Sequence, residues 1–397
     1  MENPTKEPFS LFKGGPYYRL ITAIRVVRKG SPQGGWIIPL FILITWVPLF
    51  FMSMVKGIAF GDAVELPFLY DIAPYARLLV AVPIFILAER WVDGRLGSVT
   101  IYFQESDLIP RDCLSRWETA LQEAAERRDS ILFDLIPLVF ALVLPWILIF
   151  WVNESPKSEE VPSSWFVMGR GHGNELTPAG YWYVGICLAL YQFLIFRWIG
   201  RFYIWLRFLR ALSKIPLELE PTHPDLAGGL GLLGRGQLVF TLFFLSLGVM
   251  LSVKLSHQIL YLGDTLLSLR NNIIAFVITS LVIMLAPLLL FAGKLIRTKQ
   301  QALRDYGVLG KRLSDQFDNK WVKSKEPGGG DLLETADSSA LADYGGAYEF
   351  VKHMRPLPIE IRNLVLPVVL LLLPFVPLLF LEFSVKEILK RIMDLLA

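Results

Sequence analysis

An imidazole and three carboxylates gather in one glycine-rich stretch of the chain, Leu217–Gly236 (LELEPTHPDLAGGLGLLGRG). Backbone N–H groups in such a stretch can hold an anion, while carboxylates and an imidazole can hold a cation. A His–Asp pair can also carry out acid–base chemistry. The candidate ligand-binding residues are Glu218, Glu220, His223, Asp225, Gly228, Gly229 and Gly231.

The same stretch has a purely structural interpretation, which we favour. Pro221 and Pro224 stop a helix, and the glycines permit tight turns and close backbone approach. The stretch would then be an elbow that folds against helix ends, with Asp225 capping a turn. It is not a nucleotide-binding phosphate loop, because no Lys–Ser/Thr pair follows the glycines.

Three charged residues near the ends of apolar segments form a second candidate site. Asp134 lies about one turn inside one segment, and Arg197 and Arg201 lie one turn apart on one face of the next. Ionisable residues at membrane depth are usually paired and often functional, so we expect Asp134 to pair with Arg197. The alternative is that the arginines reach lipid phosphates and that Asp134 is hydrated. Further basic residues on the same segment predict a membrane-surface anchor: Arg207, Arg210 and Lys214.

No catalytic residue, cofactor or metal centre is predicted. The two cysteines, Cys113 and Cys187, form neither a disulfide framework nor a metal motif, and His172 with Glu175 offers too few ligands. The chain lacks HExxH, G-x-S-x-G and dinucleotide-binding motifs, and it has no regular arginine ladder. We therefore do not expect a conventional intramembrane protease, nucleotide-driven pump or voltage-gated channel. A net charge of only +3 gives no reason to expect a nucleic-acid partner.

Long apolar segments must position these residues. Apolar side chains make up 54% of the 397 residues and are concentrated in blocks. A helix needs about 20 apolar residues to cross the roughly 30 Å of hydrocarbon, and a backbone in lipid must be helical. The predicted fold is an all-α membrane protein with about seven transmembrane helices and a small helical cytosolic subdomain. The predicted spans are Trp36–Val55, Arg77–Trp91 (the shortest), Ile131–Val152, Tyr181–Ile204, Leu238–Leu262, Ile273–Ile296 and Leu364–Leu381.

The distribution of Lys and Arg predicts the orientation of these spans. The N-terminal 35 residues carry six, and residues 93–130, 197–236 and 297–362 carry five, six and eleven. The intervening connections 56–75, 153–180 and 255–271 carry one, two and one. Because basic residues are enriched in cytosolic loops, the N-terminus is predicted to be cytosolic.

The last apolar block leaves the side of the C-terminus open. A seventh crossing, which we favour, would put the end of the chain outside. However, Pro367, Pro374 and Pro377 could bend this block into a re-entrant hairpin. The final residues, Phe383–Ala397, have the pattern of an amphipathic helix with a basic face, which would suit the cytosolic membrane surface.

The remaining sequence divides into short regions between the spans. Helices are expected at Leu114–Arg128, at Arg297–Val322 and at about Ser338–His353, with a flexible break at Lys325–Gly330. The predicted regions are a cytosolic N-terminal segment (1–35), spans one and two (36–92), a cytosolic helical loop (93–130), spans three and four (131–208) with an outer loop (153–180), a cytosolic Gly-rich loop (209–236), spans five and six (237–296), a cytosolic helical subdomain (297–362), and span seven with an amphipathic tail (363–397).

Several of these stretches together resemble one known group of proteins. PTHPDLAGGLG, LIPRDCLSRWE, DYGVLGKRLSDQFDNKW and SVKEILKRI look like a family of uncharacterised bacterial multi-pass inner-membrane proteins. The resemblance covers most of the chain and implies a bacterial inner membrane. The family has no established activity, so no catalytic residue is carried over.

Three classes of function are compatible with the sequence. The favoured one is a non-enzymatic binding, sensing or tethering module in the lipid bilayer that holds a cytosolic protein partner through residues 297–362. The second is a passive channel or facilitator for a small solute or ion, which the proline-broken spans favour. The third is a membrane enzyme that acts on lipid head groups through His223 and Asp225. The oligomeric state is not predicted.

Overall fold

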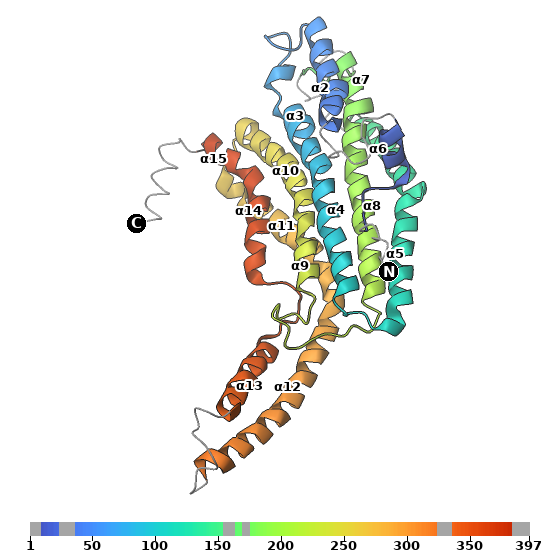
Figure 1. Cartoon of the computed structure of the whole chain (residues 1–397). Coiled ribbons are helices and arrows are strands. Elements are labelled where there is room, and N and C mark those ends of the chain that lie inside the picture. Colours follow the sequence, from blue (N-terminus) through green and yellow to red (C-terminus); the bar gives the residue numbers. More distant parts are fainter. Residues whose placement is uncertain (1–8, 24–35, 154–162, 169–174, 324–335, 383–397) are drawn as a thin grey trace.

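Within the residues that the structure describes, seven helical segments are long and apolar enough to cross a membrane (Figure 1). The structure is a computed structural model, which describes residues 9–23, 36–153, 163–168, 175–323 and 336–382. The described residues form helices, turns and isolated bridges without any extended strand. The prediction of an all-α, multi-pass membrane protein with seven spans is confirmed.

Several spans consist of two helices joined end to end. A short helix, α1 (Gly15–Ala23), precedes the first span, and α13 (Ala336–His353) lies between the last two. The spans are built, in order, from α2 (Ile37–Val55); α3 (Ile72–Tyr75) and α4 (Val82–Glu105); α5 (Leu114–Asp129) and α6 (Leu132–Asn153); α7 (Pro178–Trp182) and α8 (Ala189–Leu212); α9 (Gly231–Gln237) and α10 (Thr241–Leu262); α11 (Leu266–Leu285) and α12 (Leu289–Phe317); and α14 (Val365–Leu372) and α15 (Val376–Glu382).

Five of the six joints within the described spans are local changes of helical pitch, whereas α5 and α6 meet at Ser130, whose backbone is extended. Wider turns at Ala76–Ala81 and Tyr183–Leu188 connect α3 to α4 and α7 to α8. Tighter turns that contain Pro287 and Pro374 connect α11 to α12 and α14 to α15. Because proline lacks an N–H group, such turns let the helical path continue where a regular hydrogen bond is impossible.

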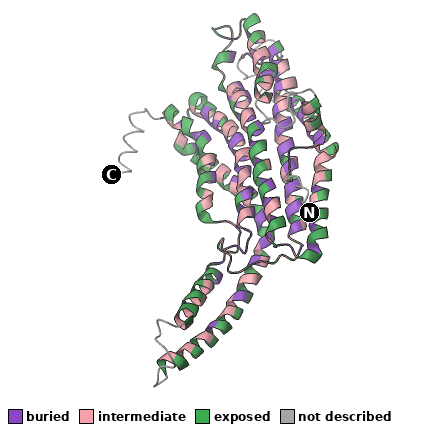
Figure 2. Cartoon of the chain, in the orientation of Figure 1, coloured by how far each residue is buried: buried purple, intermediate pink, exposed green. Residues whose placement is uncertain are grey.

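The second, fourth and fifth spans form the centre of the bundle, and the others surround it. In the fourth span, 50% of the most apolar stretch is buried, against 17% in the first. Figure 2 shows buried residues along α4, α8 and α10 and exposed residues on the peripheral helices. The exposed positions of α6 are apolar, for example Leu135, Val139 and Phe140, as expected for a surface in contact with lipid.

The second span is longer than the sequence predicts. The sequence predicts a span at Arg77–Trp91, but helix α4 continues through the first part of the predicted loop to Glu105. A stripe of apolar side chains explains the extension, because its members recur at helical spacing and are all buried: Val92, Leu96, Val99 and Phe103. These side chains belong to the main core together with residues of α5 and α8.

The last span passes from one side of the bundle to the other. Near its start, the chain lies against α9: a Cβ atom added to Gly234 would be 1.6 Å from the carbonyl oxygen of Pro358. At its end, Glu382 accepts a hydrogen bond from the backbone N–H of Leu266, 2.5 Å away, at the turn between α10 and α11. A crossing therefore replaces the re-entrant alternative for residues 361–382. The predicted amphipathic tail, residues 383–397, lies outside the described residues.

Helices α12 and α13 form an antiparallel hairpin that projects from one end of the bundle (Figure 1). Tyr344 packs between Tyr306 of α12 and Tyr348 of α13, and its hydroxyl donates a hydrogen bond to the Tyr306 carbonyl at 2.6 Å. Lys320 pairs with Asp337 at 2.5 Å. The side of the bundle from which this pair of helices projects is called the hairpin side below.

Candidate functional site

Two buried arginines of α8 lie at the centre of a charged cluster. Arg197 and Arg201 are each about 1% exposed, and their four-residue spacing places both on one face of the helix. Asp134, in the first turn of α6, lies 3.3 Å from Arg201 (Oδ1 to Nη2) and 3.9 Å from Arg197 (Oδ1 to Nε). The structure thus brings the three predicted residues together, with the shorter contact to Arg201 rather than to Arg197.

A fourth member of the cluster, Glu89 of α4, was not predicted. Its carboxylate accepts a hydrogen bond from Nη1 of Arg197. A sequence signal for it exists: Glu89 and Asp93 are four residues apart near one end of the second span, as Arg197 and Arg201 are in the fourth. Matching acidic and basic pairs at helical spacing indicate two helix faces that meet.

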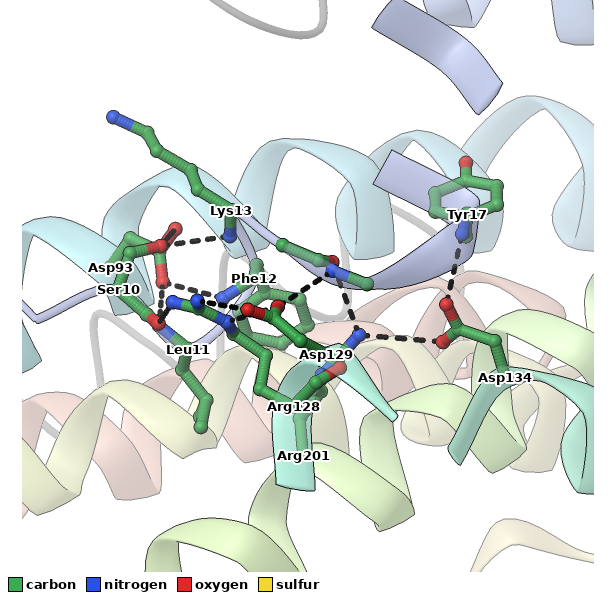
Figure 3. A network of polar contacts seen from close by, with 12 residues as sticks. Ser10, Leu11, Phe12, Lys13, Tyr17, Asp93, Arg128, Asp129, Asp134 and Arg201 are labelled. Carbon is green, nitrogen blue, oxygen red and sulfur yellow. Dashed lines mark hydrogen bonds and ion pairs between the residues drawn. The ribbon is translucent and has the colours of Figure 1, made fainter. Parts of the chain in front are cut away.

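The N-terminal segment, residues 9–17, lies across these charges and is held by carboxylates of three helices (Figure 3). Asp93 of α4 accepts hydrogen bonds from the Ser10 hydroxyl at 2.5 Å and from the N–H groups of Leu11 and Phe12 at 2.7 and 2.9 Å. The carboxylate of Asp134 accepts the Tyr17 N–H at 2.9 Å. No pattern in the sequence predicts such a role for this segment.

The end of α5 contributes a third attachment point. Asp129 accepts the Gly15 N–H at 2.9 Å, and Arg128 donates to the Ser10 carbonyl at 2.7 Å. Gly15 has a φ of +84°, and a built Cβ there would lie 2.8 Å from the Arg128 carbonyl oxygen. Only glycine fits this close crossing without strain, because other residues disfavour positive φ and carry a Cβ.

Aromatic rings of the segment complete the enclosure. The guanidinium of Arg197 lies 5.2 Å from the ring centre of Phe12 and 4.6 Å from that of Tyr17, within range of cation–π attraction. Burial, reinforced by the negative charge of Glu89, raises the pKa of Tyr17 to about 12, so its phenol stays neutral at physiological pH. Leu11 and Phe12 are buried in the main core.

We call this assembly the N-terminal clasp. It consists of segment 9–17 and the charged residues Glu89, Asp93, Arg128, Asp129, Asp134, Arg197 and Arg201. Its charged groups bind one another or the backbone of the segment. Unpaired buried charge is very costly, so these contacts require the segment to stay in place. The clasp thus fastens the segment to the bundle. It would act as a switch only if the segment were released.

The glycine-rich stretch forms a compact elbow between α8 and α9. The carboxylate of Asp225 accepts N–H groups of Ala227 at 2.8 Å, of Gly229 at 3.2 Å and of Gly231 at 2.7 Å. Burial alone would raise the pKa of Asp225, but these N–H groups and nearby His223 outweigh it and lower the pKa. The anion-binding N–H groups that the sequence suggests therefore hold a carboxylate of the elbow itself.

The other predicted residues of this stretch have mostly local partners. Nδ1 of His223 lies 2.8 Å from Oδ1 of Asp225, while Glu220 accepts the Thr222 hydroxyl at 2.7 Å. The backbone N–H of Glu218 donates to the Leu108 carbonyl at 2.9 Å. Gly228 has a φ of +62° and accepts the Glu220 N–H at 3.4 Å through its carbonyl group. These contacts describe an elbow that is closed by its own polar groups.

The elbow is fastened to the base of the hairpin. Nη2 of Arg355 donates to the Asp225 carbonyl at 2.7 Å, and the Arg355 N–H donates to the Leu226 carbonyl at 2.7 Å. Lys299 of α12 donates to the Met354 carbonyl at 2.8 Å. The orientation of the hairpin is thus coupled to the conformation of the elbow.

The clasp and the elbow are separate sites. The elbow begins beyond the end of α8 at Leu212, which lies 15 residues (212 − 197) after Arg197. At 1.5 Å per helical residue, Arg197 and the start of the elbow are roughly 22 Å apart along the helix. His223 and Asp225 therefore do not join Asp134 and Arg197 around one cavity. Within the described residues, no group of three or more His, Cys, Asp or Glu side chains could hold a metal ion.

Together, the seven spans and the clasp define a multi-pass helical membrane protein whose N-terminal segment is fastened by hydrogen bonds to a buried charged cluster of the bundle. Comparison of the chain with protein-family models, with curated proteins and with solved structures found no match.

Proposed function

We propose that the protein is a non-enzymatic anchoring module of a bacterial inner membrane that presents the α12–α13 hairpin to a cytosolic protein partner. The hairpin side is then the cytosolic side, in agreement with the excess of Lys and Arg in residues 1–35, 93–130, 197–236 and 297–362. The resemblance to bacterial inner-membrane proteins supports the compartment.

The observation that carries the proposal is a set of three open glycine positions on a projecting hairpin. Gly307 of α12 and Gly345 and Gly346 of α13 lie inside helices, and a Cβ built on any of them would meet no atom within 4 Å. Glycine inside a helix costs about 1 kcal/mol relative to alanine. Because no packing within the described chain needs these glycines, they favour a surface that another backbone approaches closely.

The connection between hairpin and bundle fits such a role. The contacts of Arg355 fix the base of the hairpin to the elbow, and Lys299 of α12 holds the adjacent Met354. Lys294 donates to the Ile215 carbonyl group just beyond the end of α8. A partner on the hairpin would therefore be held in a defined position relative to the membrane rather than on a loose tether.

The test compares two sets of glycine substitutions in the full-length protein. In the variant Gly307→Ala/Gly345→Ala/Gly346→Ala, recovery of a co-purifying partner from cells should fall at least about tenfold, while the hairpin becomes more stable. The matched control is Gly293→Ala in α12, where a built Cβ also meets no atom within 4 Å. Equal partner recovery from the triple variant and from the wild type would refute the proposal.

A second candidate, a facilitator for a small polar solute, has one observation in its favour. A groove of about 550 Å³ between α10 and α11 is lined by Lys254, Gln258 and Asn272 among apolar residues. Oε1 of Gln258 is buried without a partner in the described chain. Flux of ions or small solutes into liposomes that Gln258→Leu reduces would support this function, whereas liposomes that pass none of the solutes tested would exclude it.

A further inference from the structure

Three hollows that share lining residues follow one another along α5, α6 and α8, and together they are called the groove below. Its first part is apolar, has a volume of about 550 Å³ and lies between α6 and α8. Phe133, Pro137 and Phe140 form one wall, and Phe196, Ile199 and Tyr203 form the other. Ile199 is 50% exposed and Phe140 57%, so this wall is open to the lipid that surrounds the spans.

The second part of the groove is basic and lies between α5 and α8, with a volume of about 450 Å³. Arg116 and Arg127 of α5 face Arg207, Arg210 and Lys214 at the end of the α8 region across it. A smaller hollow of about 240 Å³ shares lining residues with both parts and is lined by Glu123, Glu126, Arg127, Ser130 and Phe133. Arg127 lines both this hollow and the basic part, and Phe133 lines both this hollow and the apolar part.

The two parts follow one face of a single helix. Phe196, Ile199 and Tyr203 recur at spacings of three and four residues, Arg207 and Arg210 continue the same series, and Lys214 follows just beyond the end of α8. The face changes from apolar to basic directly after Tyr203, an aromatic residue of the kind that prefers the membrane–water interface. The groove therefore crosses from hydrocarbon depth to the head-group layer.

The charges in the basic part are only partly compensated. Glu123 pairs with Arg127 at 3.0 Å, and Glu126 accepts a hydrogen bond from Gln122 at 2.9 Å. In the part of the chain that the structure describes, the side chains of Arg116, Arg207, Arg210 and Lys214 have neither an ion pair nor a hydrogen bond. Five basic side chains thus face two carboxylates, and the excess positive charge can bind a phosphate group.

We propose that this groove binds one anionic phospholipid, with an acyl chain between α6 and α8 and the head-group phosphate at Arg207, Arg210 and Lys214. A soluble anion would use only the basic part, and a zwitterionic lipid would offer no net charge to the excess of cations. An anionic lipid has an acyl chain for the apolar part of the groove and a charged head group for the basic part. These two parts follow each other along α8 in the order in which they occur in a lipid. The inference goes beyond the anchoring role and does not depend on a hairpin partner.

The test measures lipid binding to the purified full-length protein in detergent by native mass spectrometry. The probes are phosphatidylglycerol and phosphatidylcholine with the same acyl chains. We expect one phosphatidylglycerol to bind at least about tenfold more tightly than phosphatidylcholine. In Arg207→Gln/Arg210→Gln/Lys214→Gln, this preference should disappear, since each basic residue near a head group contributes several-fold to binding.

The matched control removes two arginines and one lysine from the exposed face of the hairpin, in Arg304→Gln/Arg312→Gln/Lys323→Gln. These residues lie outside the groove and are exposed, as Arg207, Arg210 and Lys214 are. The control should bind phosphatidylglycerol like the wild type. If both triple variants lose the preference equally, general surface charge rather than the groove binds the lipid, and the proposal is wrong.

A second variant tests the apolar half. Ile199→Trp places a large ring at an exposed position of the groove without touching the buried cluster. It should weaken phosphatidylglycerol binding at least about fivefold, because the acyl chain and the ring compete for the same space. Displacement of the lipid by millimolar glycerol 3-phosphate, or unchanged lipid binding in Ile199→Trp, would instead show a soluble-anion site and overturn the proposal.

Discussion

Oδ1 of Asp134 lies 3.3 Å from Nη2 of Arg201, while the second oxygen of the same carboxylate accepts the N–H group of Tyr17. One carboxylate thus binds a neighbouring span and the N-terminal segment at once. The pair is buried, and the segment passes beside it (Figure 3). The stability of the bundle and the position of the segment are therefore coupled.

Removing one charge of this pair should destabilise the protein strongly. Asp134→Asn leaves Arg197 and Arg201 with Glu89 as their remaining carboxylate partner, and an uncompensated buried charge costs about 3–5 kcal/mol. Thermal unfolding in detergent should show a large drop in Tm. Glu123→Gln, which breaks the half-exposed Glu123–Arg127 pair, should change stability by less than about 1 kcal/mol.

A double variant makes this prediction sharper. Asp134→Asn/Arg201→Gln should be less destabilised than the sum of its two single variants, because the residues contact each other. Additive effects would show that the pair contributes no coupling energy and that the clasp depends on Arg197 and Glu89 instead.

Asp93 should control how firmly the N-terminal segment is held. Asp93→Ala removes the acceptor for three donors, Ser10 Oγ–H and the N–H groups of Leu11 and Phe12. Amide hydrogen exchange at Leu11 and Phe12 should then accelerate by at least about tenfold, because local opening of the segment requires less free energy. In Asp62→Ala, an exposed carboxylate of the loop between α2 and α3 is lost, and exchange at these two amides should stay as in the wild type. Slow exchange in Asp93→Ala would show that Leu11 and Phe12 are held by packing alone.

The spans could be predicted from the sequence because hydrophobic length alone decides which segments cross a bilayer. The end of the second span could not, since Asp93 and Arg95 interrupt its apolar run although Val92, Leu96 and Val99 continue the buried stripe. Whether the last span crosses the bilayer or bends back could not be predicted from the sequence either, because its prolines permit both a bend and a continued helix. The contact of Glu382 with Leu266 distinguishes the two.

The candidate sites were predictable in part. Charges inside apolar segments indicate buried partners, which is how Asp134, Arg197 and Arg201 were found. The N-terminal segment was missed because its contribution comes mainly from backbone N–H groups, which every residue has and no pattern marks. For the elbow, the sequence shows glycines and Asp225 but not that the carboxylate binds the N–H groups of the same loop.

The elbow should contribute a pH-dependent stability. The pKa of Asp225 lies below its ordinary value of 3.8 in the folded protein, so its stabilising effect is complete above about pH 4 and is lost as pH falls through the folded pKa. At pH 7, Asp225→Asn should lose about 1–3 kcal/mol, because an amide cannot accept at both ends from Ala227 and Gly231. The difference in Tm between wild type and variant should shrink as pH falls below about 4. A difference that stays constant over this range would mean that the charge of Asp225 is not involved, and the exposed Asp112→Asn serves as the control.

Labelling of introduced cysteines should reveal the orientation of the bundle. The N-terminal segment precedes the first span and the hairpin follows the sixth, so both lie on the same side whatever that side is. The enrichment of Lys and Arg predicts that this side is cytosolic. In intact cells, a membrane-impermeant maleimide should therefore label Asp62→Cys, while Lys13→Cys and Lys323→Cys should react only after the membrane is permeabilised. Both native cysteines, Cys113 and Cys187, are buried and should give a low background. Labelling of Lys323→Cys in intact cells would show that the bundle has the opposite orientation. The hairpin would then lie outside the cytosol and could not present a surface to a cytosolic partner.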